Sequence, residues 1–159
     1  MRRITVLCVG KLKEKFYADA AAEYIKRLSR YCKLDVIELP ETRLPEDPSP
    51  AEIQKALAAE ANAIRQKLEA GAVVAMCIEG KTCSSEALSK KLADFALEGK
   101  SRVTFLIGGS FVVYETLKKQ ADWRLSMSHM TFPHHLARVM LLEQIYRACQ
   151  IAEGTRYHK

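Results

Sequence analysis

Three short runs of apolar, β-favouring residues constrain the fold more than any other feature of the sequence. They are ITVLCV at residues 4–9, AVVAMCI at residues 72–78 and VTFLI at residues 103–107. Such runs are typical of strands that are buried on both faces, as in a parallel sheet. Helical patterns separate them, at residues 16–30, from Ser49 to about residue 70, and from Ser84 or Ser85 to about residue 99. The alternation predicts an α/β fold, in which helices cover both faces of a mostly parallel sheet.

The remaining segments fit this alternation. A capping box begins the second helix, because Ser49 and Glu52 stand three residues apart with Pro50 at the first helical position. Weaker patterns predict a half-exposed strand at residues 34–39, a short helix at residues 114–120 and a strand at residues 123–128. No internal repeat or linker divides the 159 residues, so we expect a single domain over residues 1–159.

The last helix, expected from about His134 to Ala152 between Pro133 and Gly154, is apolar nearly all round. Its apolar residues fall on two sides, with Leu136, Val139 and Met140 on one and Leu141, Ile145 and Cys149 on the other. In so small a protein, two apolar sides indicate that the helix packs on its own sheet and on a partner subunit.

The composition indicates what class of partner the protein binds and in which compartment it works. Lys and Arg outnumber Asp and Glu by 25 to 19, and the sequence pI is about 9.1. This sign suits a phosphate-rich partner, but a merely soluble basic protein explains the charge equally well. The five scattered cysteines contain no CxxC pair, which predicts neither disulfides nor a zinc site and favours the reducing cytoplasm. No segment approaches the roughly 18 apolar residues of a membrane span, so we expect no membrane partner.

Several common kinds of site are excluded by the motifs. The turn after the first strand, at residues 10–14, lacks the repeated glycines of a dinucleotide site, and neither GxxxxGK[ST] nor GxSxG occurs. His129 lies five residues before the adjacent His134 and His135, a poor spacing for ligands on one helix face, so no metal is expected. Ligands of parallel sheets bind beyond the carboxyl ends of the strands. The candidate site is therefore formed by the loops after Ile78, at Gly108-Gly109 and at residues 128–133.

The motifs at these loops resemble those of the RlmH family, which are bacterial SPOUT-class methyltransferases that modify a pseudouridine of large-subunit ribosomal RNA. The specific segments are IGGS at residues 107–110, SMSHMTFPHHLARVMLLEQIYRA at residues 126–148 and YHK at residues 157–159. The likeness extends to VGKLKEKFY at residues 9–17 and IEGK at residues 78–81, and so covers essentially the full length.

The resemblance implies a SPOUT-like fold with a deep C-terminal trefoil knot, S-adenosyl-L-methionine held in the knot, and a homodimer. It also implies methylation of N3 of a pseudouridine in 23S ribosomal RNA, on the ribosome. The cofactor contacts that it carries over are Met76, which is expected at the end of the third strand, and Gly108, Gly109, Met127, Ser128, His129, Met130, Thr131 and Phe132.

One position departs from the family pattern. The family usually continues GG-x-x-G, whereas Val112 stands where the third glycine is expected. If that glycine uses a positive φ, a β-branched residue there is strained by roughly 1–3 kcal/mol, and the loop takes another path. A non-catalytic ribosome- or RNA-binding relative with an impaired cofactor site is therefore the alternative to an active enzyme. A small-molecule α/β enzyme is a third hypothesis, which the basic charge and the YHK terminus disfavour.

The candidate catalytic residues are His134, Arg138, Glu143, Tyr157 and His158. Methyl transfer to an imide nitrogen requires the loss of its proton, and His134, Glu143 or His158 is the candidate acceptor, directly or through water. A helix-start histidine bonded to the backbone is an equally good interpretation of His134. Arg138 is a candidate for binding phosphate or orienting the base. The resemblance implies that the tail residues Tyr157 and His158 help to complete the substrate site.

Overall fold

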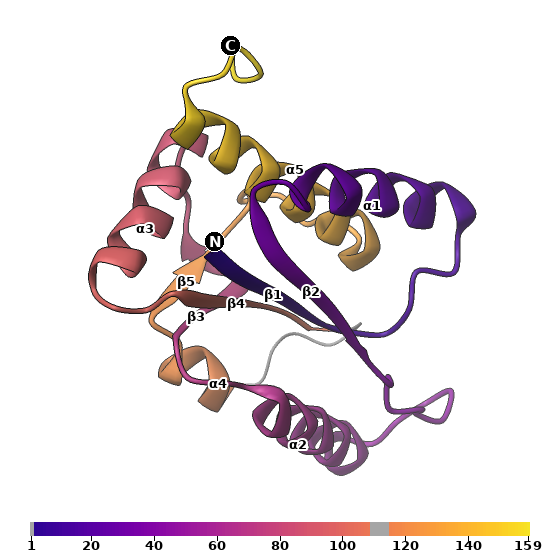
Figure 1. The fold of residues 1–159 in the computed structure, drawn as a ribbon. Coiled ribbons are helices and arrows are strands. Elements are labelled where there is room, and N and C mark those ends of the chain that lie inside the picture. Colours follow the sequence, from indigo (N-terminus) through magenta and orange to yellow (C-terminus); the bar gives the residue numbers. More distant parts are fainter. Residues whose placement is uncertain (1, 109–114) are drawn as a thin grey trace.

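Figure 1 shows the computed structural model of the protein, which describes residues 2–108 and 115–159. Five strands form one parallel sheet in the order β2-β1-β4-β3-β5. The strands are β1 (Arg2–Val9), β2 (Cys32–Leu39), β3 (Ala72–Lys81), β4 (Arg102–Ile107) and β5 (Trp123–Leu125). The helices are α1 (Lys15–Leu28), α2 (Pro50–Lys67), α3 (Ser85–Leu97), α4 (Glu115–Gln120) and α5 (His134–Glu153). The predicted α/β fold is confirmed.

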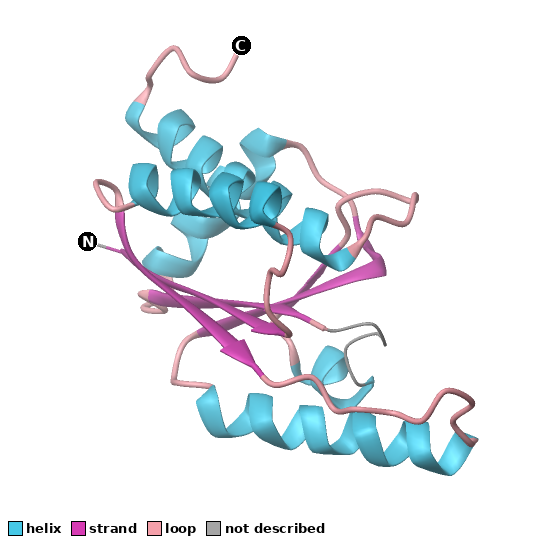
Figure 2. Ribbon diagram, turned by 90° about the vertical axis from the view of Figure 1, so that its right-hand side faces the viewer, coloured by secondary structure: helices cyan, strands magenta, loops and turns pink. Residues whose placement is uncertain are grey.

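Helices cover both faces of the sheet. Figures 1 and 2 show α1, α3 and α5 on one face and α2 and α4 on the other. Alternate residues of β1 point to opposite faces, so Ile4 and Val6 join one hydrophobic cluster while Leu7 and Val9 join the other. This explains why the run at residues 4–9 is apolar throughout. Each fully buried aliphatic side chain contributes about 1.5–3 kcal/mol to the free energy of unfolding.

The helix boundaries follow the predicted signals closely. The Ser49 hydroxyl accepts a hydrogen bond from the Glu52 amide at 3.2 Å, and the Glu52 carboxylate accepts one from the Ser49 amide at 3.1 Å. The predicted capping box is therefore confirmed. Of the two serines proposed to begin the third helix, Ser84 is the cap, because its hydroxyl accepts from the Ala87 amide. Gly154, at φ 70°, ends α5.

Two strands differ from the prediction. The strand expected over residues 123–128 ends at Leu125, because the Ser126 amide bonds to the Lys81 carbonyl and the chain then turns. Conversely, β3 continues to Lys81, so Met76 lies inside this strand and not at its end. The pairing of β3 with β4 nevertheless stops at Ala75, whereas its pairing with β5 runs from Val74 to Met76 and resumes, after a register shift, at Lys81.

The apolar surface of α5 is covered in part by its own chain. Leu141, Ile145 and Cys149 are buried in the main cluster, whereas Leu136 and Met140 are only half-buried. The helix lies beside both α1 and α3 (Figure 1). The predicted contact of α5 with a partner subunit stays a prediction.

The trefoil knot also stays a prediction, because its path includes the connection from β4 to α4. Gly109 and Val112 belong to that connection, at residues 109–114, and lie outside the described residues. Within the described part of the chain, no helix is both long enough and apolar enough to cross a membrane.

Candidate active site

A cavity of about 450 Å³ lies at the carboxyl edge of the sheet, a volume ordinary for a small-molecule site. Three loops meet there, because parallel strands all end at the same edge. The lining residues come from β3 and its end (Met76, Cys77, Ile78), from the end of β4 (Ile107, Gly108), from the segment before α5 (Ser126, Met127, Ser128, Met130, Thr131, Phe132, Pro133) and from α5 (His134, Ala137). Of the three predicted loops, the structure brings Gly108 and the segment before α5 to the cavity, whereas β3 contributes residues 76–78 from within the strand and not the loop after Ile78.

Most of the residues proposed for cofactor binding line this cavity. They are Met76, Gly108, Met127, Ser128, Met130, Thr131 and Phe132. His129 is exposed and is not among the described residues that line the cavity. Gly109 lies outside the described residues. Sequence reasoning missed Ser126, Ile107 and Ile78 as lining residues. The position of Ile107 at the end of β4 and of Ser126 just after β5 was a usable signal, whereas Ile78 lies inside β3.

Hydrogen bonds shape the loop between β5 and α5. The Ser126 hydroxyl donates to the Ser128 carbonyl at 2.8 Å, and the Ser128 hydroxyl accepts from the Met130 amide at 3.1 Å. The end of β3 supports this loop at close range, since a Cβ on Gly80 would lie 2.8 Å from the carbonyl oxygen of Arg124. Only glycine permits that approach. The wall of the cavity is therefore held by main-chain geometry as much as by side chains.

His134, at the start of α5, presents a half-buried imidazole to the cavity. Its Nδ1 atom is buried and has no hydrogen-bond partner among the described residues. The pKa of His134 is lowered from its ordinary value of 6.5, first by burial and then by the charges of His135 and Arg138, against the opposing carboxylates of Glu41 and Glu14. His134 is therefore neutral near pH 7. The alternative of a backbone-bonded histidine is not what the structure shows for Nδ1.

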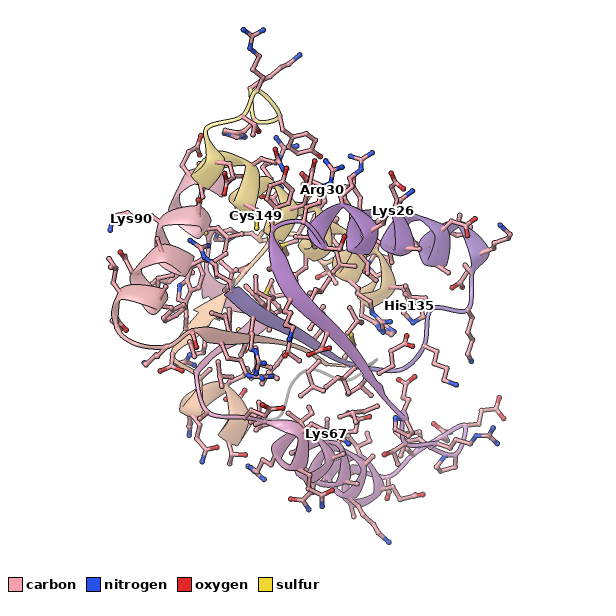
Figure 3. The ribbon with its side chains drawn as sticks, in the orientation of Figure 1. Lys26, Arg30, Lys67, Lys90, His135 and Cys149 are labelled. Atoms are coloured by element: carbon pink, nitrogen blue, oxygen red, sulfur yellow. The ribbon has the colours of Figure 1, made fainter. Side chains whose placement is uncertain are left out.

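His135, which is labelled in Figure 3, follows His134 on the first turn of α5. The ring centroids of the two histidines are 4.1 Å apart, and the ring of His135 lies 6.2 Å from that of Tyr17. His135 Nδ1 is 3.7 Å from a Glu14 carboxylate oxygen. His135 thus contacts the N-terminal end of α1 and is not among the described residues that line the cavity.

Arg138 is 2% exposed and does not line the cavity. Its guanidinium donates to the Glu38 carboxylate at 2.6 Å and to the Gly10 carbonyl at 2.8 Å. These bonds tie α5 to the carboxyl ends of β1 and β2. The geometry gives Arg138 a structural role, and its proposed contact with substrate stays a prediction.

The other candidate catalytic residues form a second group at the far half of α5. Glu143 pairs with Arg147 at 2.7 Å, and Arg147 Nη1 lies 3.2 Å from His158 Nδ1. The Arg147 guanidinium also covers the Tyr157 ring at 4.8 Å. His158 Nε2 lies 2.6 Å from a Glu86 carboxylate oxygen, and this hydrogen bond lowers the pKa of Glu86. The tail is therefore folded back against α5 and α3.

The two groups are well separated within one chain. His134 and Glu143 are nine residues apart on α5, which corresponds to about 14 Å along the helix axis. The structure thus brings His134 together with the predicted cofactor residues, and brings Glu143, Tyr157 and His158 together elsewhere.

An α/β protein with a ligand cavity at the carboxyl edge of a parallel sheet fits several classes, and the comparisons select one. The family model described as "Predicted SPOUT methyltransferase" matches residues 2–158. Among solved structures, a probable methylase family protein from Haemophilus influenzae Rd KW20 covers 98% of this chain and 70% of its own, with a TM-score of 0.54. Its sequence identity is 10%, so it supports the fold alone. The class is that of the SPOUT methyltransferases.

Curated relatives define the family more narrowly. The chain is 48% identical to "Putative ribosomal RNA large subunit methyltransferase H" of Methanococcus maripaludis, over 98% of this chain and 99% of the relative. It is 46% identical to "Ribosomal RNA large subunit methyltransferase H" of Acetivibrio thermocellus and 47% identical to that of Bifidobacterium adolescentis, each over 99% of both chains. The chain belongs to the ribosomal RNA large subunit methyltransferase H family, RlmH, as its motifs indicated.

Proposed function

We propose that this protein transfers a methyl group from S-adenosyl-L-methionine to N3 of a pseudouridine in 23S ribosomal RNA, on the ribosome and as a homodimer. The observation that carries the proposal is the convergence of the motif loops on one cavity that His134 borders. Relatives named ribosomal RNA large subunit methyltransferase H, matched over nearly the whole chain, support the substrate class. The excess of basic residues suits an RNA partner.

The residues of the cavity fit the proposed cofactor. Apolar side chains such as Met76, Ile107 and Phe132 suit an adenine ring, and the main chain around Ser128 offers polar groups for the amino-acid end. The orphaned Nδ1 atom of His134 is a polar group in need of a partner. Since His134 is neutral, it does not repel a positively charged sulfonium. When bound, S-adenosyl-L-methionine supplies an electrophilic methyl group.

The chain's own contribution is position and proton removal. The loops at Gly108 and Ser128 hold one reactant, and the accuracy of that placement is the main source of rate in a displacement reaction. His134, kept neutral by burial, accepts the proton of the attacking imide nitrogen.

The separation of the two residue groups supports a homodimer. In one chain, Tyr157 and His158 contact α3 and the far half of α5 and not the cavity at His134. A second copy packed against the half-buried side of α5, at Leu136 and Met140, can bring its own tail to the cavity. The complete site then includes residues of both chains.

The proposal is tested with isotope-labelled S-adenosyl-L-methionine and ribosomes from a strain that lacks the enzyme, followed by nucleoside mass analysis. The expected product is N3-methylpseudouridine from 23S RNA. Ribosomes from the parent strain, which already carry the modification, are the matched control and should accept no label. Label on another nucleoside, or none at all, refutes the proposed reaction. Calorimetry with the cofactor separates an inactive enzyme from a relative that no longer binds it.

A further inference from the structure

A second cavity, of about 240 Å³, adjoins the first. The two share Ser126 and Met127 as lining residues. The remaining lining residues come from the start of α3 (Cys83, Ser84, Ser85, Leu88), from β5 (Leu125) and from the middle of α5 (Met140, Leu141, Gln144). Cys83 and Ser84 are exposed, so the cavity is reached from solvent. It lies between the first cavity and the group formed by Glu143 and the tail.

A defined set of polar groups lines one side of this second cavity. The Ser85 hydroxyl donates to Gln144 Oε1 at 2.6 Å, and Gln144 Nε2 donates to the Glu143 carboxylate at 3.3 Å. Because a carboxylate only accepts, Glu143 determines which end of the Gln144 amide faces it. In the described part of the chain, the second N–H of Gln144 and the lone pairs of Ser85 have no hydrogen-bond partner. A donor and an acceptor therefore stand next to each other.

We propose that the second cavity binds the uracil-type base that receives the methyl group, with Ser85 and Gln144 reading its edge. The inference rests on the proposed function and names its acceptor subsite. A uracil-type ring presents N–H and C=O groups in alternation, which match the neighbouring acceptor and donor. Its flat faces suit Leu88 and Leu125. Enzymes that modify a base hold it, once unstacked, in a fitted pocket of this kind. The shared residues Ser126 and Met127 place that base beside the cofactor cavity.

The surrounding charges favour a neutral base over a phosphate group. The Glu143 carboxylate bonds directly to Gln144, and Glu86 follows Ser85 on the first turn of α3. The hydrogen bond from His158 lowers the pKa of Glu86 and so keeps it ionised. Glu143 engages the Arg147 guanidinium and Glu86 engages the His158 ring, so these groups are already occupied and do not hold an anion at the cavity, whereas a neutral ring needs no counter-charge.

The test compares two substitutions in the second cavity with one matched control. Ser85→Ala removes the acceptor, and Gln144→Leu removes the amide at nearly constant volume. The control is Ser89→Ala: Ser89 lies one turn further along α3, donates to the Ala148 carbonyl at 2.9 Å, and does not line the cavity. All three variants lose one hydrogen bond between α3 and α5. Each is assayed for cofactor affinity by calorimetry and for kcat/KM with ribosomes that lack the modification.

We expect kcat/KM to fall by about tenfold or more for Ser85→Ala and Gln144→Leu, the loss of one hydrogen bond to a neutral group, while cofactor affinity stays at the wild-type value. Ser89→Ala should keep wild-type kcat/KM. If wild-type protein is active and Ser85→Ala matches Ser89→Ala, the subsite is refuted and the proposed function stands. A cofactor affinity that falls by the same factor as kcat/KM also refutes the subsite, because the substitutions then act on the cofactor cavity and not on a bound base. Wild-type protein without methyl transfer overturns the proposed function, and the subsite with it.

Discussion

Substituting Arg138 by methionine tests how the start of α5 is held over the cavity. Methionine keeps most of the buried volume but removes the hydrogen bonds to the Glu38 carboxylate and the Gly10 carbonyl. Removing one partner of a buried ion pair costs about 3–5 kcal/mol. The Glu38 side chain is 35% exposed and regains water when its partner is lost. We therefore expect the free energy of unfolding to fall by about 2–4 kcal/mol.

Urea unfolding at pH 7 measures this loss. Glu38→Gln keeps an acceptor for Arg138 but leaves the buried guanidinium without its counter-charge, so it should cost a similar amount, about 2–4 kcal/mol, and the double variant should lose less than the sum of the two. If Arg138→Met lowers the free energy of unfolding by less than about 1 kcal/mol, the pair of Arg138 and Glu38 contributes no more than an exposed salt bridge, and this reasoning is refuted. Lost methyl transfer at wild-type stability would instead support contact of Arg138 with substrate.

Three further predictions concern the cavity and the tail. Because folding lowers the pKa of His134, the unfolded chain takes up a proton near pH 6.5 before the folded chain does. The free energy of unfolding of the wild-type protein should therefore fall relative to that of His134→Gln as the pH drops below 6.5. Urea-unfolding stabilities that change in parallel with pH in the two proteins would contradict this. Deleting Tyr157–Lys159 should abolish methyl transfer and leave the thermal midpoint nearly unchanged, since the lost contacts are partly exposed; unaltered activity would remove the tail from the site. Ser126→Ala should weaken cofactor binding in calorimetry by about tenfold, because the bond that shapes the loop at Ser128 is lost; wild-type affinity would show that the loop holds without it.

Local patterns predicted most of the secondary structure. The run at residues 4–9 is buried on both faces of the sheet, and the capping box of Ser49 and Glu52 begins α2 as expected. Errors arose where pairing decides the outcome. The segment after Leu125 alternates as a strand would, but the Lys81 carbonyl takes the Ser126 amide and the chain turns away. The local sequence pattern gives no sign that the Lys81 carbonyl will bond to the Ser126 amide.

The candidate site was predicted in part. The three loops meet at one cavity because parallel strands end at a common edge, a rule that needs only the order of elements. The motif at residues 126–148 led us to expect His134 and Glu143 in one site, but the structure places them apart. His134 borders the cavity, whereas Glu143 lies about 14 Å further along the axis of α5. Because the motif continues along a helix that is longer than the cavity, its first residues lie at the cavity and its later residues lie elsewhere.

The sequence by itself determined the class of fold, the ends of most helices and the loops that build the cavity, because each depends on neighbouring residues or on the order of elements. Only the tertiary structure decided which distant side chains meet. Arg138 reaches Glu38 across 100 residues, and Ser85 reaches Gln144 across 59. Such contacts follow from the packing of helices against a completed sheet, and that packing gives Arg138 a structural partner and gives the second cavity its polar wall.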